Sequence, residues 1–359
     1  MSNKILLLTH GNENIAKGGP SVRVKALCKS LNRHGVCARF DYFRNDLEIE
    51  EDIVHVFNFW PFESSVNVLR SLKKGQKKIF FSPIYLDLSE RSFWRDTLPY
   101  VSNNDPEEIK VHYHAFKNVE QKFKENYSHQ VANQIRTLFH YIDGLIFLSA
   151  FEKRKIEEVL KEKINIRNHL MLNSVNQNFW KPIFNNSQTE KRYFVSVGRI
   201  EPRKNQLLSA LAFKGLDTDL FLIGKPSGAF YFNKIRKINA TNVKFLGHIN
   251  NDSEEYKNII GNAHGFISSS WAEGAPVSAI EACSMGVPLA LTNLSSEYEY
   301  YADLAKYFKP WDVLGLRKII NDMAAQQRTE QSRVSFSNYA KSKFDVDFHA
   351  KEICSFYFS

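Results

Sequence analysis

The chain has 359 residues, of which 43% are hydrophobic and 24% charged, and its formal net charge is +9. This length exceeds what one ordinary core fills and predicts two domains, and the apolar content excludes a disordered chain. No apolar run approaches the ~20 residues of a membrane-spanning helix, and the N-terminus lacks the features of a signal peptide. We therefore expect a cytoplasmic protein. Four scattered cysteines without a Cys-x-x-Cys pair indicate reduced structural thiols.

The positive charge is spread evenly, since residues 1–180 carry +5 and residues 181–359 carry +4. An even excess argues against a dedicated nucleic-acid face, because such a face concentrates charge. It suits an anionic substrate or an anionic membrane surface. One tight basic cluster lies within 73–78. It is either a solvated helix end or a contact with acidic lipid headgroups.

Short apolar runs alternate with helical patterns through the first half of the chain. Residues 4–9 read as a buried parallel strand, a glycine-containing loop follows, and residues 22–33 have helical periodicity. A long stretch at 107–141 reads as helix. Further strands are expected at 37–43, 53–57, 78–82, 145–149 and 170–172.

Residues 173–191 are polar and contain Pro182, which is typical of a linker. Beyond them the alternation resumes, with strands expected at 193–197, 220–223, 243–246, 265–268 and 288–291. Repeated strand–helix units predict an α/β fold with two Rossmann-like, doubly wound domains facing across a cleft. We expect the domains at 1–175 and 176–335, with ligands at the carboxyl ends of the strands.

A first candidate site follows the strand at 193–197. Gly198 would let the backbone approach a ligand closely, and the helix start near residue 205 favours an anion. Arg199 adds a bidentate fork and Lys204 a point charge. Together these groups would hold a diphosphate; an ordinary charged loop is the alternative.

A second candidate site holds Glu273 in a small-residue loop and Glu281 near the start of the following helix. Carboxylates accept pairs of hydroxyl donors well, so the two side chains suit a sugar ring and a ribose. Glu281 alone could instead favour a helix N-terminus through the dipole.

These residues carry a family resemblance. Glu273 and Glu281, together with Gly274, Gly286 and Pro288, resemble the signature of retaining GT-B glycosyltransferases of family 4. The stretch 198–205 resembles the donor-phosphate motif of that family. The remaining likenesses occur in the same order as in the family, at 18–20, 173–182, 222–224, 243–247 and 307–310.

The resemblance implies a role for each matching residue. Arg199 and Lys204 would neutralise the departing diphosphate in place of a metal, Glu281 would hold the ribose, and Glu273 would hold the donor sugar. A helix over 336–359 would cross back to the first domain. The implied donor-binding set is Gly18, Gly19, Gly198, Arg199, Lys204, Glu273, Gly274, Ala275, Pro276, Val277 and Glu281.

The sequence also departs from the family. Members often have a histidine after the fourth strand, but this chain has none there, and Tyr85 or Asp87 is the candidate for its place. His10 at the end of the first strand and Glu297 after the last are further candidates. No metal site is expected, because Asp217 and Asp219 read as a solvated turn.

The resemblance implies a metal-independent retaining hexosyltransferase without a cofactor, which moves a sugar from a UDP-sugar or GDP-sugar to an acceptor hydroxyl. Bacterial members often build lipopolysaccharide, O-antigen or capsule chains. An oligosaccharide or lipid-linked glycan acceptor is therefore expected, with peripheral contact at the cytoplasmic face of the inner membrane. The alternatives are a non-catalytic nucleotide-sugar-binding module and a sugar-nucleotide epimerase on the same fold. Nucleic acid is not an expected partner.

Overall fold

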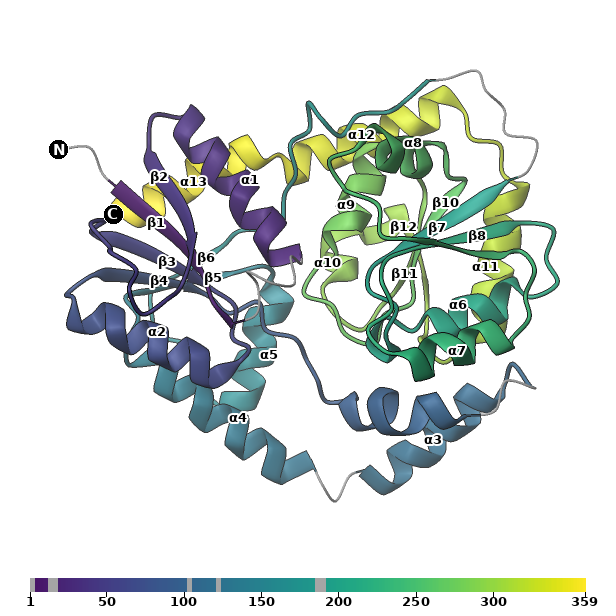
Figure 1. The fold of residues 1–359 in the computed structure, drawn as a ribbon, viewed down its shortest axis with the longest axis horizontal. Helices are drawn as coiled ribbons and strands as arrows, with labels where there is room; N and C mark the ends of the chain where they lie inside the picture. The colour runs from purple at the N-terminus through teal and green to yellow at the C-terminus, as the bar shows by residue number, and fades with distance from the viewer. Residues whose placement is uncertain (1–3, 12–18, 102–104, 121–123, 185–191) are drawn as a thin grey trace.

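The computed structural model describes residues 4–11, 19–101, 105–120, 124–184 and 192–359. The chain forms two lobes, each built on a six-stranded sheet in which every pairing is parallel (Figure 1). Helices cover both faces of each sheet, since alternate strand residues enter different cores. The predicted α/β fold with two parallel sheets is confirmed.

The N-terminal sheet has the strand order β2-β1-β3-β4-β5-β6. Leu6 and Leu8 of β1 enter one core with the helices α2, α4 and α5, whereas Ile5 and Leu7 enter another with α1 and α13. The strands are β1 (Lys4–Thr9), β2 (Cys37–Tyr42), β3 (Ile53–Phe57), β4 (Lys78–Ser82), β5 (Gly144–Phe147) and β6 (Asn168–Leu170). The helices are α1 (Gly19–Arg33), α2 (Phe62–Lys74), α4 (Lys124–Phe139), α5 (Ala150–Leu160) and α13 (Val346–Phe358).

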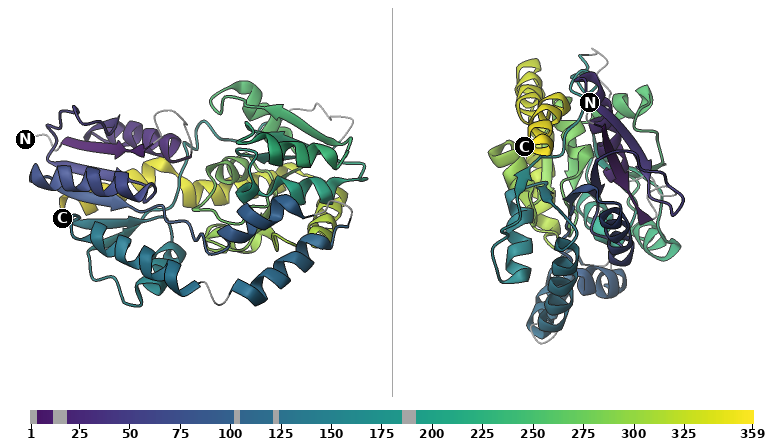
Figure 2. Two further views of the ribbon diagram at one scale, coloured as in Figure 1. Left: turned by 60° about the horizontal axis from the view of Figure 1, so that its bottom comes forward. Right: turned by 90° about the vertical axis from the view of Figure 1, so that its left-hand side faces the viewer.

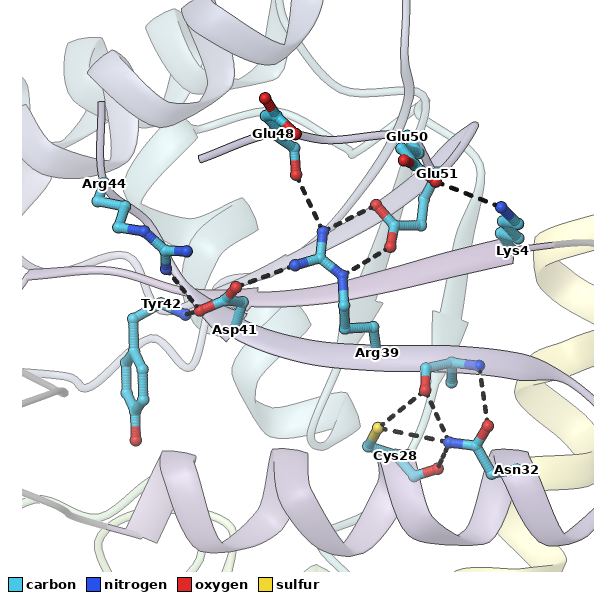
Figure 3. A network of polar contacts seen from close by, with 11 residues as sticks. Lys4, Cys28, Asn32, Arg39, Asp41, Tyr42, Arg44, Glu48, Glu50 and Glu51 are labelled. Atoms are coloured by element: carbon cyan, nitrogen blue, oxygen red, sulfur yellow. Dashed lines mark hydrogen bonds and ion pairs between the residues drawn. The ribbon is translucent and has the colours of Figure 1, made fainter. Parts of the chain in front are cut away.

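The exposed edge of this sheet, β2, is covered by a charged network (Figure 3). The guanidinium of Arg39 donates to both carboxylate oxygens of Glu51, at 2.8 and 3.1 Å, and to Asp41 at 2.9 Å. Asp41 also pairs with Arg44 at 2.9 Å. Charges on an edge strand discourage pairing with another chain, so this network protects the sheet rather than forming a site.

The C-terminal sheet has the strand order β12-β11-β10-β7-β8-β9. Its strands are β7 (Tyr193–Val197), β8 (Asp219–Ile223), β9 (Val243–Gly247), β10 (Gly265–Ser268), β11 (Leu289–Thr292) and β12 (Ala305–Phe308). Its helices are α6 (Gln206–Phe213), α7 (Ala229–Lys237), α8 (Glu254–Asn262), α9 (Val277–Ser284), α10 (Glu297–Tyr301), α11 (Val313–Ala325) and α12 (Glu330–Phe344), with 3-10 turns η4 (Pro202–Lys204) and η5 (Ala302–Leu304).

The C-terminal end of the chain crosses from one lobe to the other. Helix α12 packs on α9 of the C-terminal lobe, and α13 packs on α1 of the N-terminal lobe (Figure 1). The hydroxyl of Tyr357 lies 2.6 Å from the Nδ1 of His55, which points out of the middle of β3. The last helix is therefore part of the N-terminal core.

A segment of the N-terminal half crosses in the opposite direction. The residues at 107–141 form two helices rather than the single one expected, and the first of them, α3 (Glu108–Glu120), lies beside α6 and α7 of the other lobe (Figures 1 and 2). The turns before it, η2 (Phe93–Thr97) and η3 (Leu98–Tyr100), lie there too. The sequence pattern over 107–141 predicted helix, but it gave no sign that the chain changes lobes between α3 and α4.

Candidate functional site

The predicted ligand groups of the C-terminal lobe meet where its strand order reverses. The chain leaves β7 toward β8 on one side and leaves β10 toward β11 on the other, so the two loops diverge at the kind of position where open parallel sheets bind ligands. Lys204 follows β7 and Glu273 follows β10. The Nζ of Lys204 donates to the Oε1 of Glu273 at 2.5 Å, although 69 positions separate them.

The end of β7 is shaped by two glycines. Gly198 has a φ of +147° and Gly224, at the end of the neighbouring β8, has a φ of +150°. A Cβ on Gly224 would lie 1.9 Å from the carbonyl oxygen of Gly198, so no side chain fits between the two strand ends. The backbone of Gly198 is thereby held beside the side chain of Lys204, whose Cε would lie 3.3 Å from a Cβ on Gly198.

Asn205 fixes the turn that carries Lys204. Its backbone has a φ of +55°, a conformation that asparagine tolerates better than most residues. Its buried Nδ2 donates to the carbonyl oxygens of Ser269 at 3.1 Å and Pro310 at 2.8 Å. The loops that follow β7, β10 and β12 are thus joined through one side chain.

Arg203 is the site residue that the sequence analysis missed. Its guanidinium donates to the carbonyl oxygen of Ala272 at 2.7 Å and to Glu201 at 2.8 Å, and it lies 3.7 Å from the Oε2 of Glu273. The predicted Arg199, by contrast, is 63% exposed and lies 3.6 Å from Glu201. The charges of the stretch 199–204 marked a basic turn, but no pattern in it shows which basic side chain points inward.

The two cations determine the charge state of Glu273. Burial acts to raise the pKa of Glu273, but the positive charges of Lys204 and Arg203 outweigh it, so the pKa lies below its ordinary value. Burial lowers the pKa of Lys204, and the neighbouring carboxylate opposes this shift. Glu273 is therefore an ionised carboxylate with a cation at each oxygen.

The residues after Glu273 face the other lobe. A Cβ on Gly274 would lie 3.4 Å from Leu148 and 3.6 Å from both Ile84 and Leu86, which follow strands of the N-terminal sheet. The carbonyl oxygen of Ala275 accepts a hydrogen bond from Asn173 at 2.7 Å. Pro276 caps α9, and Val277 is its first residue. Gly274 and Ala275 thus line the junction of the lobes.

Glu281 is held apart from Glu273, inside the C-terminal lobe. It is 3% exposed, and its Oε2 accepts a hydrogen bond from the hydroxyl of Tyr256 at 3.0 Å. Burial raises the pKa of Glu281 to about 7, against the opposing effect of the Tyr256 hydrogen bond. The helix-dipole alternative gains no support, because the side chain lies one turn inside α9 with a partner from α8.

Glu297 reaches Glu273 through Ser295. The Oε2 of Glu297 accepts the backbone N–H of Ser295 at 2.8 Å, and the backbone N–H of Glu273 donates to the Oγ of Ser295 at 3.3 Å. Burial raises the pKa of Glu297 to about 8. Two residues further on, Glu299 accepts the backbone N–H groups of Ala150 and Phe151 from the other lobe, at 2.7 and 2.9 Å.

The candidates of the N-terminal lobe have partners within that lobe. His10 is buried between the Oγ of Ser64 at 3.0 Å and the carbonyl oxygen of Asn58 at 2.8 Å. Tyr85 packs in the core, with its ring nearly perpendicular to that of Phe59, and donates its backbone N–H to Glu152 at 2.6 Å. Asp87 lies 3.7 Å from Lys155. Gly18 lies outside the described residues, and Gly19 is the first residue of α1.

No group of three or more His, Cys, Asp or Glu side chains with the geometry of a metal site occurs within the described ranges. Asp219 pairs with Lys244 at 2.6 Å, and it begins β8 rather than ending it. Asp217 and Asp219 therefore lie at the amino-terminal end of β8, whereas Lys204 and Glu273 follow the carboxyl ends of their strands.

A shallow depression of about 400 Å³ adjoins the site at the boundary of the lobes. It is lined by Phe151 and Arg154 of α5 and by Asn293, Leu294, Ser295, Tyr298 and Glu299 around α10. Ser295 connects this depression to the backbone of Glu273.

Comparison with known proteins bears on both halves of the chain. Residues 179–343 match the family described as glycosyl transferases group 1. No curated protein matches the chain by sequence at a significant level.

Solved structures of similar fold cover almost the whole chain. Sucrose-phosphate synthase from Thermosynechococcus elongatus has a TM-score of 0.75 at 13% identity, over 99% of this chain and 98% of that one. Anabaena Alr3699/HepE in complex with UDP-glucose has a TM-score of 0.69 at 14% identity, over 98% of both chains. The lipopolysaccharide outer core galactosyltransferase WaaB, in its apo form, has a TM-score of 0.61 at 15% identity, over 98% of this chain and 99% of that one. The predicted GT-B architecture is thereby confirmed.

Proposed function

We propose that this chain, whose residues 179–343 match the glycosyl transferases group 1, is a retaining enzyme that moves a sugar from a UDP-sugar or GDP-sugar to an acceptor hydroxyl. The observation that carries this proposal is the buried ion pair of Lys204 and Glu273, with Arg203 beside it, at the switch point of the C-terminal sheet. A crevice at that point is where open parallel sheets bind nucleotides.

The diphosphate of the donor is assigned to the end of β7. The backbone of Gly198 lies beside the side chain of Lys204 there, and the exposed Arg199 follows Gly198 directly in the chain. Positive groups fixed around the departing phosphates stabilise the negative charge that develops as the sugar leaves, which removes the need for a metal. Glu273 then accepts hydroxyls of the donor sugar, and Glu281 accepts those of the ribose.

UDP is favoured over GDP as the nucleotide. HepE, which shares the fold over 98% of the chain, is described in complex with UDP-glucose. This likeness supports UDP by analogy of fold.

The acceptor is assigned to a glycan of bacterial cell-surface polysaccharide assembly, such as lipopolysaccharide, O-antigen or capsule. WaaB, of the same fold, is a lipopolysaccharide outer core galactosyltransferase. The depression beside Ser295 offers an arginine, an amide and two aromatic rings, which suits a hydroxyl-rich ligand at the boundary of the lobes.

Contact with an anionic membrane is proposed at the far edge of the N-terminal lobe. Lys73, Lys77 and Lys78 line a shallow depression of about 430 Å³ there, together with Gln76 and Asp143. None of the helices in the described part of the chain has the length and apolar content that crossing a membrane requires. Co-sedimentation with phosphatidylglycerol vesicles should fall in a K73A/K77A double variant, and unchanged binding would contradict this placement.

The test of the function is calorimetric titration of the full chain with UDP and with GDP, in chelator. The variants are Arg199→Ala and Glu281→Ala. The matched controls are Arg236→Ala and Glu254→Ala, which change exposed residues of α7 and α8. Binding of one nucleotide, weakened in both variants and retained in both controls, supports the donor site. Binding of neither would contradict it, and binding without transfer to any glycan would identify a non-catalytic module.

A further inference from the structure

A segment from the N-terminal half is built into the core of the C-terminal lobe. We call residues 93–101 and 105–116 the strap. Its buried side chains share one cluster with Leu207 of α6, Ile320 of α11 and Trp271. They are Phe93, Leu98, Val101, Ile109 and Tyr113. In Figure 1 the strap, which includes most of α3, lies beside α6 and α7 of the right-hand lobe. The strands that precede and follow it in sequence, β4 and β5, lie in the other lobe.

The strap contacts Trp271 directly, two residues before Glu273. The ring of Phe93 meets the indole edge-on, with centroids 5.1 Å apart, and the ring of Tyr113 lies 5.4 Å from it. Tyr113 also stacks on Trp311, with centroids 4.0 Å apart and planes inclined by 14°. Aromatic contacts of this kind stabilise beyond the area they bury and define the orientation of the rings.

Packing alone orients the indole of Trp271. Its Nε1 is buried and has no hydrogen-bond partner among the residues that the structure describes. Apart from Trp311, at 6.0 Å, the rings that pack on it belong to the strap. Removal of a strap ring would therefore leave the indole with space and without a polar restraint.

Trp271 is linked in turn to both loops of the site. Its backbone N–H donates to the carbonyl oxygen of Arg203 at 2.8 Å, and Arg203 donates to the carbonyl oxygen of Ala272 at 2.7 Å. The strap turn η2 also packs on η4, the turn that holds Lys204. The strap thus touches the two segments whose side chains form the Lys204–Glu273 pair.

We propose that the strap positions the donor site, so that nucleotide-sugar binding by the C-terminal lobe depends on Phe93 and Tyr113 from the N-terminal half. This inference rests on the proposed function, since it concerns the same donor site. A displacement of catalytic groups by about 1 Å can cost a hundredfold in rate, which makes the packing behind Trp271 matter to the chemistry. Phe93 and Tyr113 are positioning residues, because they act through Trp271.

The experiment compares Tyr113→Ala with Tyr113→Phe in the full chain. Affinity for UDP and GDP is measured by calorimetry, and backbone amide exchange over residues 270–276 is measured without nucleotide. Ile320→Ala, in the same cluster on α11, controls for a general loss of stability, and Val111→Ala, at a strap residue that is 63% exposed, controls for surface changes. If Tyr113→Ala does not fold, Phe93→Leu takes its place in the same measurements.

We expect Tyr113→Ala to weaken nucleotide binding by about tenfold or more and to speed exchange of the Trp271 amide, whereas Tyr113→Phe restores both. Ile320→Ala should lower the melting temperature about as much as Tyr113→Ala does. Its nucleotide affinity should stay within about twofold of that of the unaltered chain. The proposal would be overturned by equal losses of nucleotide affinity in Tyr113→Ala and Ile320→Ala. It would also be overturned if amide exchange over residues 270–276 were unchanged in Tyr113→Ala. If the unaltered chain binds neither nucleotide, the proposed function fails, and the exchange measurement still decides whether the strap orders the loop.

Discussion

Glu273 has a cation at each of its carboxylate oxygens: Lys204 lies 2.5 Å from Oε1, and Arg203 lies 3.7 Å from Oε2. These ion pairs satisfy the carboxylate. In the proposed function, a diphosphate at the end of β7 would compete for Lys204 and free Oε1 for a hydroxyl of the donor sugar. We therefore expect donor binding and the availability of Glu273 to be coupled.

The first prediction concerns Glu273→Gln. The amide keeps a hydrogen bond to Lys204 but loses the negative charge, so Lys204 is released toward phosphate. We expect affinity for UDP alone to hold or rise, while the rate of sugar transfer falls by about 100- to 1,000-fold. Calorimetry and a transfer assay measure the two effects. Near-normal turnover would remove Glu273 from the mechanism, and Glu254→Gln on the surface is the control.

The second prediction separates Arg203 from Arg199. Arg203 is largely buried and bridges Glu201 and the carbonyl oxygen of Ala272, whereas Arg199 is 63% exposed. Arg203→Ala should lower the free energy of unfolding by about 1–3 kcal/mol, because it strands buried hydrogen-bond acceptors. Arg199→Ala should change stability by less than about 0.5 kcal/mol and still weaken nucleotide binding. Chemical denaturation checks the difference, and equal losses of stability would contradict it.

Much of the architecture could be predicted because strand and helix patterns are local. Apolar runs such as residues 193–197 mark buried parallel strands, and the loops after them hold the site wherever the sheet reverses. That rule places Lys204 and Glu273 after the carboxyl ends of their strands, but their ion pair depends on the strand order, which the sequence alone does not show. Their predicted roles toward a donor stay predictions.

The strap could not be predicted, for a physical reason. Phe93 and Tyr113 carry the same apolar signal as any core residue, and periodicity does not say which of two cores they enter. The same holds for Arg203, whose inward direction depends on the carbonyl oxygen of Ala272, a partner 69 positions away. The spacing of neighbouring residues does not predict contacts between residues that are far apart in the sequence.

The third prediction tests how the last helix is held. The hydroxyl of Tyr357 is the partner of the buried Nδ1 of His55, whose Nε2 lies 2.8 Å from the Oγ of Ser82. Tyr357→Phe leaves that nitrogen without a partner and should lower the free energy of unfolding by about 1–3 kcal/mol. Phe358→Ala, at a residue that is 39% exposed, is the control. Deletion of residues 336–359 should go further and cause aggregation, because it uncovers the core behind α1.

The fourth prediction concerns metals. If Arg199 and Lys204 supply the positive charge that the departing diphosphate needs, transfer should continue in excess chelator at close to its full rate. A transfer assay with and without added Mg²⁺ measures this. Complete loss in chelator, restored by Mg²⁺, would assign the charge stabilisation to an ion instead.

The last prediction concerns pH and follows from the burial of Glu281, which raises the pKa of this carboxyl to about 7. A carboxyl whose pKa is higher in the folded chain than in the unfolded one binds more protons when folded, so its contribution to stability is present at low pH and is lost as the pH rises through about 7. With 1.36 kcal/mol per unit of pKa, the loss attributable to Glu281 is on the order of 3 kcal/mol.

Glu281→Gln cannot ionise and should be more stable than the unaltered chain at pH 8 but not at pH 5. Glu297 and Glu152 have pKa values raised to about 8 and about 7 by burial, so a slope of the same sign should persist in this variant, reduced in size. In the unaltered chain, nucleotide affinity should rise as the pH rises through about 7. The reason is that an ionised Glu281 accepts two ribose hydroxyls better than a protonated one does. Melting curves and UDP titrations from pH 5 to pH 8 measure both trends. An affinity that is independent of pH in this range would remove Glu281 from the ribose site.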